Sequence, residues 1–237
     1  MINMENINEH TLQFQFLGQN CFLITYKNIN ILTDPFYNMQ LEKSSFDITQ
    51  QKIDYILITH AHADHTADVQ EVLEHHPEAI LIGQPEVCAY FSHKKFVDLN
   101  FGGSCVVHGL KIAMVPASHT SSFPDGRYGG EPAGYVLSSG DHHIYFAGDT
   151  GIMSDMALLP QLFGNIAAAV LPVGGHYTMD ASQAAFAAAE LIKTQKVVGC
   201  HFDTFPPISI DHGEALEAFN KRNIECILPA VGQIIQL

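Results

Sequence analysis

A run of six residues is the feature of this sequence that most limits which fold the chain can adopt. Residues 55–59 have the composition of a strand that is covered on both faces, and the next residues read His60-Ala61-His62-Ala63-Asp64-His65. Four imidazole and carboxylate groups this close together suit zinc, iron or manganese. A polar loop with incidental histidines is the alternative, but the position directly after a strand favours a metal site.

The spacing inside this motif predicts two ion positions. In an extended chain, His60 and His62 point to the same side and would bind one ion. Asp64 and His65 would face a second ion where the chain turns into a helix. The alanines between these side chains are small, so the loop can fold tightly around both ions.

Apolar runs in the rest of the chain predict a mixed α/β protein. Period-2 alternation and turn residues predict a β-meander at residues 12–33. Further strands are expected at residues 79–83, 104–107, 110–115, 134–137, 143–147, 167–171, 196–200, 224–228 and 231–235. Helices are expected at residues 66–75, 181–193 (capped by Asp180) and about 211–222 (opened by a capping box of Asp211 and Glu214). These elements predict one α/β domain over residues 1–237, with sheets packed face to face and helices outside.

The composition argues against several classes of protein. With 237 residues, 47% of them hydrophobic and 15% charged, the chain can bury a sizeable core. Its formal net charge of −14 argues against nucleic acid and anionic lipid as partners. No apolar stretch approaches the roughly 20 residues that cross a bilayer, and the first ten residues lack the pattern of a secretory leader. Five scattered cysteines fit free thiols in a reducing compartment, so we expect a cytoplasmic protein.

The motif at residues 60–65 resembles the signature of the metallo-β-lactamase superfamily, a His-x-His-x-Asp-His loop after a buried strand. The resemblance implies a four-layer αββα sandwich with a dinuclear metal site. It implies that Asp149 bridges the two ions and that Asp34 orients a metal-binding histidine. The implied ligands are His60, His62, Asp64, His65, His119, Asp149 and His201. Each later candidate follows a strand-like run, where α/β proteins place their sites.

A finer resemblance extends over nearly the whole chain. Motifs such as Leu17-Gly18, Thr33-Asp34-Pro35 and Pro132-Ala133-Gly134 are similar to a poorly characterised group of bacterial and archaeal metal-dependent hydrolases. That group is similar to the ascorbate-6-phosphate lactonase branch. Two positions depart from the pattern of the branch: Gln19-Asn20 occupies a turn that often has His, and Ser118 stands where an aromatic residue often occurs.

These residues imply a hydrolase that uses two divalent ions, with zinc preferred and manganese, nickel or iron as alternatives. Two ions, two carboxylates and a bridging hydroxide leave a charge of about +1, which would attract a substrate oxygen. The metal-bound hydroxide would attack a small ester, lactone, amide or phosphoester, including anionic ones. Asp64 would orient the hydroxide, and His176 would protonate the leaving group, with Tyr177 as the alternative donor. Arg127 and Tyr177 are the candidate substrate contacts.

Three other functions fit parts of the pattern. A nuclease could use the same metal site, but no insertion domain or basic arm is apparent and the net charge opposes it. An iron-dependent oxidoreductase similar to persulfide dioxygenases stays open. A structural metal scaffold is disfavoured, because a structural zinc site needs four ligands and seven candidates are present. We therefore expect an enzyme with a small-molecule substrate, without nucleic-acid or membrane partners, which could form a homo-oligomer.

Overall fold

Two seven-stranded sheets form the centre of the part of the chain that we describe, residues 11–38 and 46–237 of a computed structural model. The first sheet has the order β14-β1-β2-β3-β4-β5-β6, and the second has the order β13-β12-β11-β10-β9-β8-β7. The strands are β1 (Gln13–Gly18), β2 (Cys21–Tyr26), β3 (Ile29–Thr33), β4 (Tyr55–Leu57), β5 (Ile80–Gly83), β6 (Phe96–Asp98), β7 (Ser104–Val107), β8 (Leu110–Pro116), β9 (Ala133–Ser139), β10 (His142–Phe146), β11 (Ile166–Pro172), β12 (Lys196–Cys200), β13 (Glu225–Ile227) and β14 (Ile234–Gln236).

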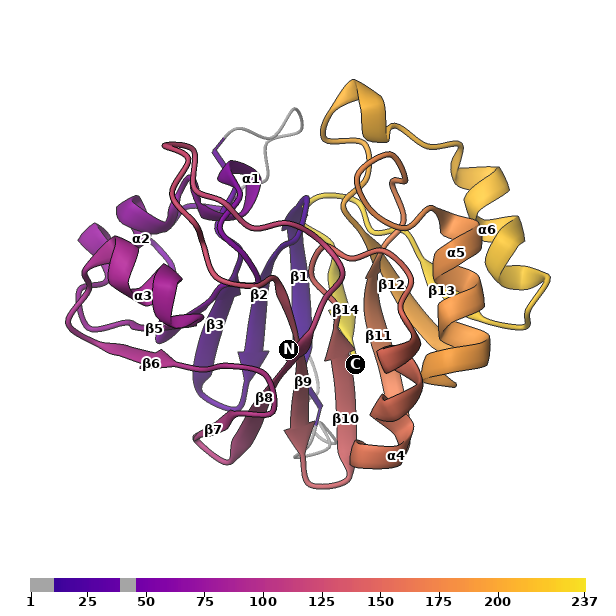
Figure 1. The fold of residues 1–237 in the computed structure, drawn as a ribbon, viewed down its shortest axis with the longest axis horizontal. Helices are drawn as coiled ribbons and strands as arrows, with labels where there is room; N and C mark the ends of the chain where they lie inside the picture. The colour runs from indigo at the N-terminus through magenta and orange to yellow at the C-terminus, as the bar shows by residue number, and fades with distance from the viewer. Residues whose placement is uncertain (1–10, 39–45) are drawn as a thin grey trace, which may run out of the picture.

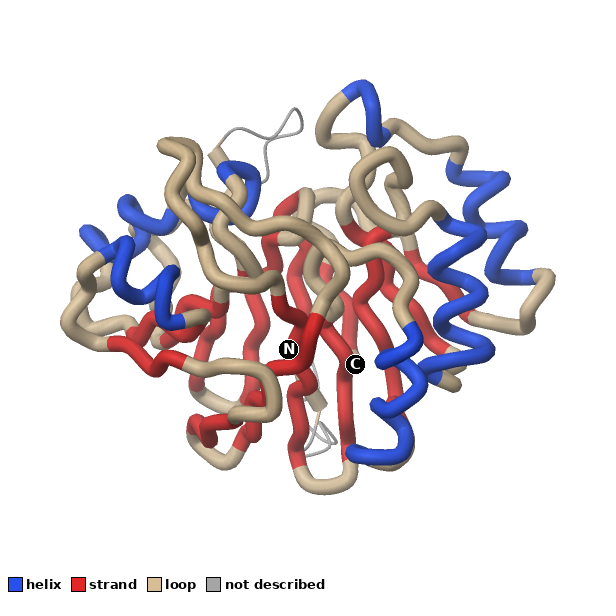
Figure 2. The backbone as a smooth tube through the Cα atoms, in the orientation of Figure 1, coloured by secondary structure: helices blue, strands red, loops and turns tan. Residues whose placement is uncertain are grey.

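Helices cover the outer face of each sheet. In Figures 1 and 2, α2 and α3 lie on one side of the molecule and α4, α5 and α6 on the other, with the strands between them. The helices are α1 (Ala63–Thr66), α2 (Val69–His75), α3 (Pro85–Phe91), α4 (Leu159–Phe163), α5 (Ala181–Phe186) and α6 (His212–Asn220). The 3₁₀ segments are η1 (Ser154–Leu158) and η3 (Pro206–Ile208), and the π-helical segment η2 (Ala187–Ile192) continues α5.

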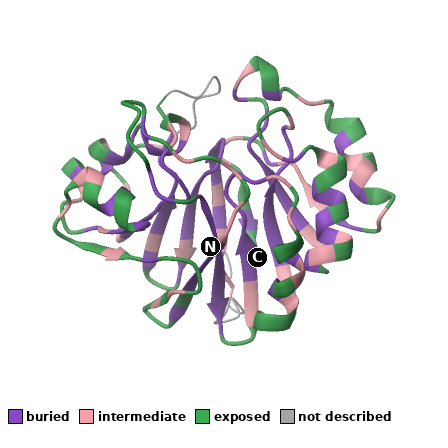
Figure 3. Cartoon of the chain, in the orientation of Figure 1, coloured by how far each residue is buried: buried purple, intermediate pink, exposed green. Residues whose placement is uncertain are grey.

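The two sheets pack face to face through apolar side chains. Phe22 of β2 meets Phe146 of β10 edge to face, with ring centroids 5.9 Å apart. Strand β1 alternates as predicted, because Phe14 and Phe16 are buried in this core while the glutamines between them are half-buried. The strands are largely buried and most exposed residues lie on helices and loops (Figure 3). The expected four-layer αββα sandwich is therefore confirmed.

One end of the sandwich gathers the segments that carry the chemistry. The loops after β3, β4, β8, β10 and β12 all meet at the same end, the upper one in Figure 1. Strands β3 and β4 run parallel in the first sheet, as do β10, β11 and β12 in the second, so their carboxyl ends share an edge. This topology brings together residues that are far apart in the sequence.

Several element boundaries differ from the sequence prediction. The helix expected at residues 66–75 is interrupted between α1 and α2, where the Asp68 carboxylate accepts hydrogen bonds from the backbone N–H groups of Tyr37 and Asn38 (2.6 and 2.9 Å). The final strand begins at Ile234 instead of residue 231, because Gly232 forms a turn and donates its N–H to Phe16. Helix α3, strand β6 and helix α4 were not predicted.

The two predicted helix caps differ in kind. Asp180 accepts the N–H of Gln183, whose side chain returns a bond to the Asp180 backbone, so α5 has a full capping box. Asp211 accepts the N–H of Glu214, but no reciprocal bond from the Glu214 side chain is present. The predicted capping box at Asp211 is therefore wrong, and a simple N-cap takes its place.

No helix in the described ranges is long and apolar enough to cross a bilayer. The first ten residues, on which the expectation about a secretory leader rests, lie outside the described part of the chain.

Candidate metal centre

The predicted ligands lie in two adjacent groups at the end of the sandwich. One group holds His60, His62 and His119, and the other holds Asp64, His65, Asp149 and His201. Within each group, one nitrogen or oxygen atom per residue lies within 4.8 Å of the corresponding atom of every other member. The motif at residues 60–65 thus divides between two positions, as its spacing predicted.

Three imidazoles make up the first group. The Nε2 atom of His60 lies 3.0 Å from Nδ1 of His62, and the rings of His60 and His62 each have their centroid 5.1 Å from that of His119. His60 and His62 follow β4 of the first sheet, whereas His119 follows β8 of the second. Three neutral imidazoles with open space beside them are a donor set that suits zinc.

Asp149 lies between the two groups. Its Oδ2 atom is 2.9 Å from Nε2 of His201, 3.4 Å from Nε2 of His65 and 3.5 Å from Nε2 of His119. Because His119 belongs to the first group and the other two histidines to the second, this carboxylate contacts both. The position matches the bridging role that the resemblance implied for Asp149.

Asp34 and Thr59 fix the tautomers of two of the histidines. The Thr59 hydroxyl donates to Asp34 (2.7 Å), so the same oxygen accepts from Nδ1 of His60 (3.1 Å). The Asp34 carboxylate also accepts from Nδ1 of His65 (2.8 Å). Each imidazole is thereby left with its Nε2 lone pair directed away from Asp34. Asp34 therefore contacts a candidate ligand as the resemblance implied.

Asp34 itself adopts an unfavourable backbone conformation. Its φ angle is +36°, outside the regions that non-glycine residues prefer. The carboxylate accepts from both the N–H and the hydroxyl of Thr59, and the backbone N–H of Asp34 donates to Leu57. These buried bonds hold the residue in place, so local strain is balanced by contacts that also orient the ligands.

Gln19 and Asn20 have a role that the sequence did not reveal. Both are fully buried, and they donate from their side-chain amides to Asp64 (2.7 Å) and to Asp149 (2.8 Å), respectively. They form the turn at one of the two places where the chain departs from the lactonase branch, the other being Ser118. The substitution leaves a pair of amide donors, one for each candidate carboxylate ligand.

The electrostatics of the centre follow from burying histidines beside carboxylates. Although burial opposes it, Asp149 and Asp64 raise the pKa of His65 well above the usual value for histidine. Burial likewise opposes charge on His201, but Asp149 and Asp64 raise the pKa of His201 to about 9. Burial and the neighbouring His65 lower the pKa of His60, which favours its neutral, ligand-competent form.

The side chains fit divalent ions. The Nε2 atom of His65 and Nδ1 of His201 are buried without a hydrogen-bond partner, whereas Nε2 of His201 faces Oδ2 of Asp149 at 2.9 Å. Orphaned nitrogens at the centre of a protein are costly unless another group satisfies them. Three nitrogens in one group, and two nitrogens with two carboxylates in the other, are donors that zinc, manganese or iron accepts.

A pocket of about 640 Å³ opens over the centre. It is lined by Phe36, His62, Ala63, Asp64, Ala67, His119, Thr120, Asp149, Tyr177, His201 and Phe205. Tyr177, a predicted substrate contact, is thus part of the wall. His176 is exposed and does not line the pocket; it packs edge to face on Tyr177 with ring centroids 4.4 Å apart.

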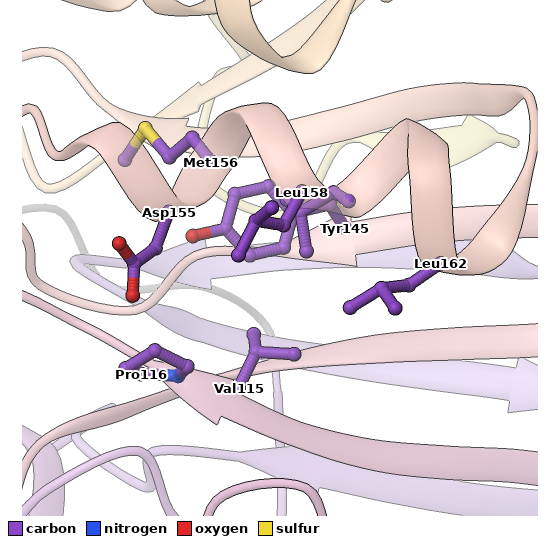
Figure 4. Close-up of a pocket in the computed structure, with 8 residues that line it drawn as sticks. Val115, Pro116, Tyr145, Asp155, Met156, Leu158 and Leu162 are labelled. Carbon is purple, nitrogen blue, oxygen red and sulfur yellow. The ribbon is translucent and has the colours of Figure 1, made fainter.

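Arg127 is not brought to the pocket. Its guanidinium bonds to Asp125 and lies over the ring of Tyr90, 4.3 Å from the ring centroid. A smaller apolar pocket lies elsewhere, between α4 and strands β8 and β10, and includes Val115, Tyr145 and Leu162 (Figure 4). It has no candidate metal ligand in its wall.

Comparison with known proteins agrees with this geometry. Residues 29–202 match the family described as the beta-lactamase superfamily domain. A UPF0173 metal-dependent hydrolase of Christiangramia forsetii is 39% identical over 229 residues, which is 95% of this chain and 100% of the relative. The chain belongs to the UPF0173 metal-dependent hydrolases. The expected superfamily and enzyme class are thereby confirmed.

Solved structures extend the comparison to the fold. Igni18, a metallo hydrolase of the archaeon Ignicoccus hospitalis, superposes on this UPF0173 chain with a TM-score of 0.85 and 30% identity, covering 96% of this chain and 98% of Igni18. CmlA, a diiron β-hydroxylase of Streptomyces venezuelae, has a TM-score of 0.71 at 13% identity and covers 98% of this chain but 55% of CmlA. The second likeness shows the fold alone.

Proposed function

We propose that this chain hydrolyses a small ester or lactone at a dinuclear metal centre, with amides and phosphoesters as further candidates. The observation that carries the proposal is the contact of Asp149 with both donor groups at the floor of one pocket. Two ions held by these groups would supply Lewis acidity and would lower the pKa of a coordinated water towards neutrality. Zinc is our first choice, with manganese, nickel or iron as alternatives.

Asp64 is the carboxylate best placed to accept a hydrogen bond from the attacking water. It lines the pocket with 27% of its side chain exposed, whereas Asp149 is almost wholly buried. The side-chain amide of Gln19 donates a hydrogen bond to Oδ2 of Asp64 and holds the carboxylate in place. Burial alone would raise the pKa of Asp64, but His65 and His201 lower it, so the carboxylate is ionised at neutral pH and can accept a hydrogen bond from the attacking water.

Of the two candidate proton donors to the leaving group, Tyr177 is better placed than His176. Its phenol belongs to the pocket wall, while His176 supports the ring of Tyr177 from outside. We therefore assign the substrate contact to Tyr177 and a supporting position to His176. Thr120 adds a second hydroxyl to the wall, 3.4 Å from Nε2 of His62.

Metal content and ligand variants test the proposal together. We expect about two ions per chain by elemental analysis, and hydrolysis of 4-nitrophenyl esters that a chelator abolishes and added zinc or manganese restores. His62→Ala and Asp149→Asn should each reduce kcat/KM more than about a hundredfold with the fold retained, because each removes a ligand. Unchanged hydrolysis by either variant would contradict the metal-dependent mechanism.

Iron chemistry is the second candidate, because the imidazole and carboxylate donors of the centre also suit iron. One iron per chain in the purified protein, with oxidation of thiols in place of ester hydrolysis, would favour it. A nuclease is less well supported, since the formal charge of −14 repels a phosphate backbone. Five free cysteines fit our proposal of a cytoplasmic location.

A further inference from the structure

The charge of the side chains that line the pocket over the metal centre bears on which substrates the pocket can bind. None of the lysines and arginines in residues 11–38 and 46–237 is among the lining residues. Arg127, the cation expected to meet the substrate, is held by Asp125 and Tyr90 outside the pocket. Among the described residues that line the pocket, an anionic group of a substrate would find the hydroxyls of Thr120 and Tyr177 but no lysine or arginine to pair with, and the metal ions are needed at the reacting bond.

Aromatic side chains form the wall beyond the ligands. Phe36 and Phe205 both line the pocket with ring centroids 6.0 Å apart; Phe36 is buried beneath the wall and Phe205 is half-buried. Phe36 follows Asp34 by two residues, and Phe205 follows His201 by four. The segments that orient the candidate ligands therefore also place the aromatic wall, and Ala63 and Ala67 of the α1 region widen the same surface.

The net charge of the rest of the molecule also disfavours anionic substrates. The formal charge of −14 gives the whole molecule a negative field that slows the approach of anions. A carboxylate or phosphate placed against Phe36 and Phe205 would also lose its water without gaining a partner, which is costly. An uncharged apolar group placed there would gain from burial.

We propose that the substrate is uncharged outside its reacting bond and places an apolar acyl or aryl group against Phe36 and Phe205. This inference rests on the proposed hydrolysis for the chemistry of the reacting bond, but the recognition of an apolar group does not depend on it. It narrows the sequence-based expectation, which included small anionic substrates. Tyr177, with 56% of its surface exposed, completes the wall on the side open to solvent.

A matched pair of esters tests the charge preference. 4-Nitrophenyl hexanoate and mono-4-nitrophenyl adipate share a leaving group and differ in a terminal methyl against a terminal carboxylate. With metal-loaded protein, and after subtraction of spontaneous hydrolysis, we expect kcat/KM for the hexanoate to exceed that for the adipate at least about tenfold. Equal values, or a preference for the adipate, would overturn the inference while leaving hydrolysis itself established.

A binding measurement makes the test independent of catalysis. N-phenyl-1-naphthylamine is a neutral fluorescent probe, and 8-anilinonaphthalene-1-sulfonate has the same aromatic frame with an added sulfonate. We expect the neutral probe to bind and Phe205→Ala to weaken its binding at least about fivefold, because Phe205 supplies apolar contact area. Phe101→Ala removes an exposed phenylalanine outside the pocket and should leave the affinity unchanged.

The two readouts separate failure of this inference from failure of the proposed function. Binding of the neutral probe that depends on Phe205, with no hydrolysis of either ester, would support the apolar pocket and contradict ester hydrolysis. Sulfonate binding that is equally tight and equally sensitive to Phe205→Ala would overturn the apolar, uncharged preference.

A charge introduced at the pocket provides a gain-of-function check. Tyr177→Arg changes an exposed residue, so the fold should tolerate it. The variant should raise the adipate-to-hexanoate ratio of kcat/KM about fivefold, the factor that corresponds to about 1 kcal/mol for a surface charge pair. An unchanged ratio would show that the pocket does not contact this part of the substrate, and would overturn the proposal.

Discussion

Asp34 does not line the pocket over the metal centre, but it holds His65 and Thr59 in position through hydrogen bonds. Replacing it with alanine removes the acceptor for Nδ1 of His65, so the imidazole can rotate or change tautomer. We expect Asp34→Ala to weaken zinc affinity about 10- to 100-fold, the usual loss when such a supporting contact is removed. Competition with a chromophoric chelator measures the affinity, and circular dichroism verifies that the fold persists.

An exposed aspartate supplies the control for this variant. Asp98 lies at the end of β6 and outside the metal centre, so Asp98→Ala should bind zinc as the unmodified chain does. If Asp34→Ala also retained full affinity, the bond between Asp34 and His65 would not be what orients the ligand.

The pH dependence of metal affinity follows from the raised histidine pKa values. Because Asp149 and Asp64 outweigh burial and raise the pKa of His201 to about 9, the metal-free protein carries a proton on His201 at neutral pH. Metal must displace this proton, so zinc affinity should rise about tenfold per pH unit between about pH 6.5 and pH 9 for each proton displaced. Chelator competition across this range measures the slope. A flat profile would show that His201 is already neutral before metal binds.

At the residue scale, the grouping of candidate ligands could be predicted where they are close together in the chain. The spacing within residues 60–65 was enough to divide His60 and His62 from Asp64 and His65. The amide contacts of Gln19 and Asn20 could not be predicted in this way, because their partners lie 45 and 129 residues away. Sequence distance says nothing about which carboxylate a buried amide will reach.

Close contact between elements at the centre depends on Gly174, which follows β11. A Cβ atom there would overlap the backbone carbonyl oxygen of His201, and backbone cannot move aside as a flexible side chain can. We expect Gly174→Ala to displace His201 and to lower both zinc content and kcat/KM at least about tenfold. Elemental analysis and ester hydrolysis measure the two quantities.

Gly151 gives a matched control in a loop of the same region. A Cβ at this position would have its nearest neighbour at 3.7 Å, an ordinary van der Waals contact. Gly151→Ala should therefore leave zinc content and activity within about twofold of the unmodified protein. Normal metal content in Gly174→Ala would show that the β11 loop tolerates the larger side chain.

The elements that were missed share a physical cause. Strand β6 is a three-residue edge strand with no fully buried residue, so it lacks the alternation that identifies a strand. The break between α1 and α2 depends on Asp68 bonding to Tyr37 and Asn38, which follow β3. Periodicity indicates which residues of a segment are buried, and it does not identify distant backbone donors that bond to a side chain and interrupt a helix.

On the scale of the whole molecule, the ligands come from both sheets. Residues 60–65 follow β4 in the first sheet, while His119, Asp149 and His201 follow strands of the second. Bound ions would therefore join the two halves of the sandwich. With free metal at about a thousand times its Kd, binding raises the free energy of unfolding by about 4 kcal/mol. Removing the metal with a chelator should therefore lower the Tm by roughly 10 °C. Identical melting curves with and without chelator would contradict this linkage.

The layered architecture could be predicted, but the strand order could not. Alternation of apolar residues shows which face of a strand is buried and does not identify its neighbour. The parallel pairing of β4 with β5, and the return of β14 to β1, are set by packing over long sequence distances. The αββα expectation came from the resemblance carried by the metal-binding motif.

The return of the chain to its first strand has a consequence for synthesis on the ribosome. Strand β14 pairs antiparallel with β1, and Leu237 exchanges two backbone hydrogen bonds with Leu12. Until residue 237 has been translated, β1 presents an unpaired edge to which another nascent chain could add. A chaperone that shields this edge during synthesis should therefore increase the yield of soluble protein.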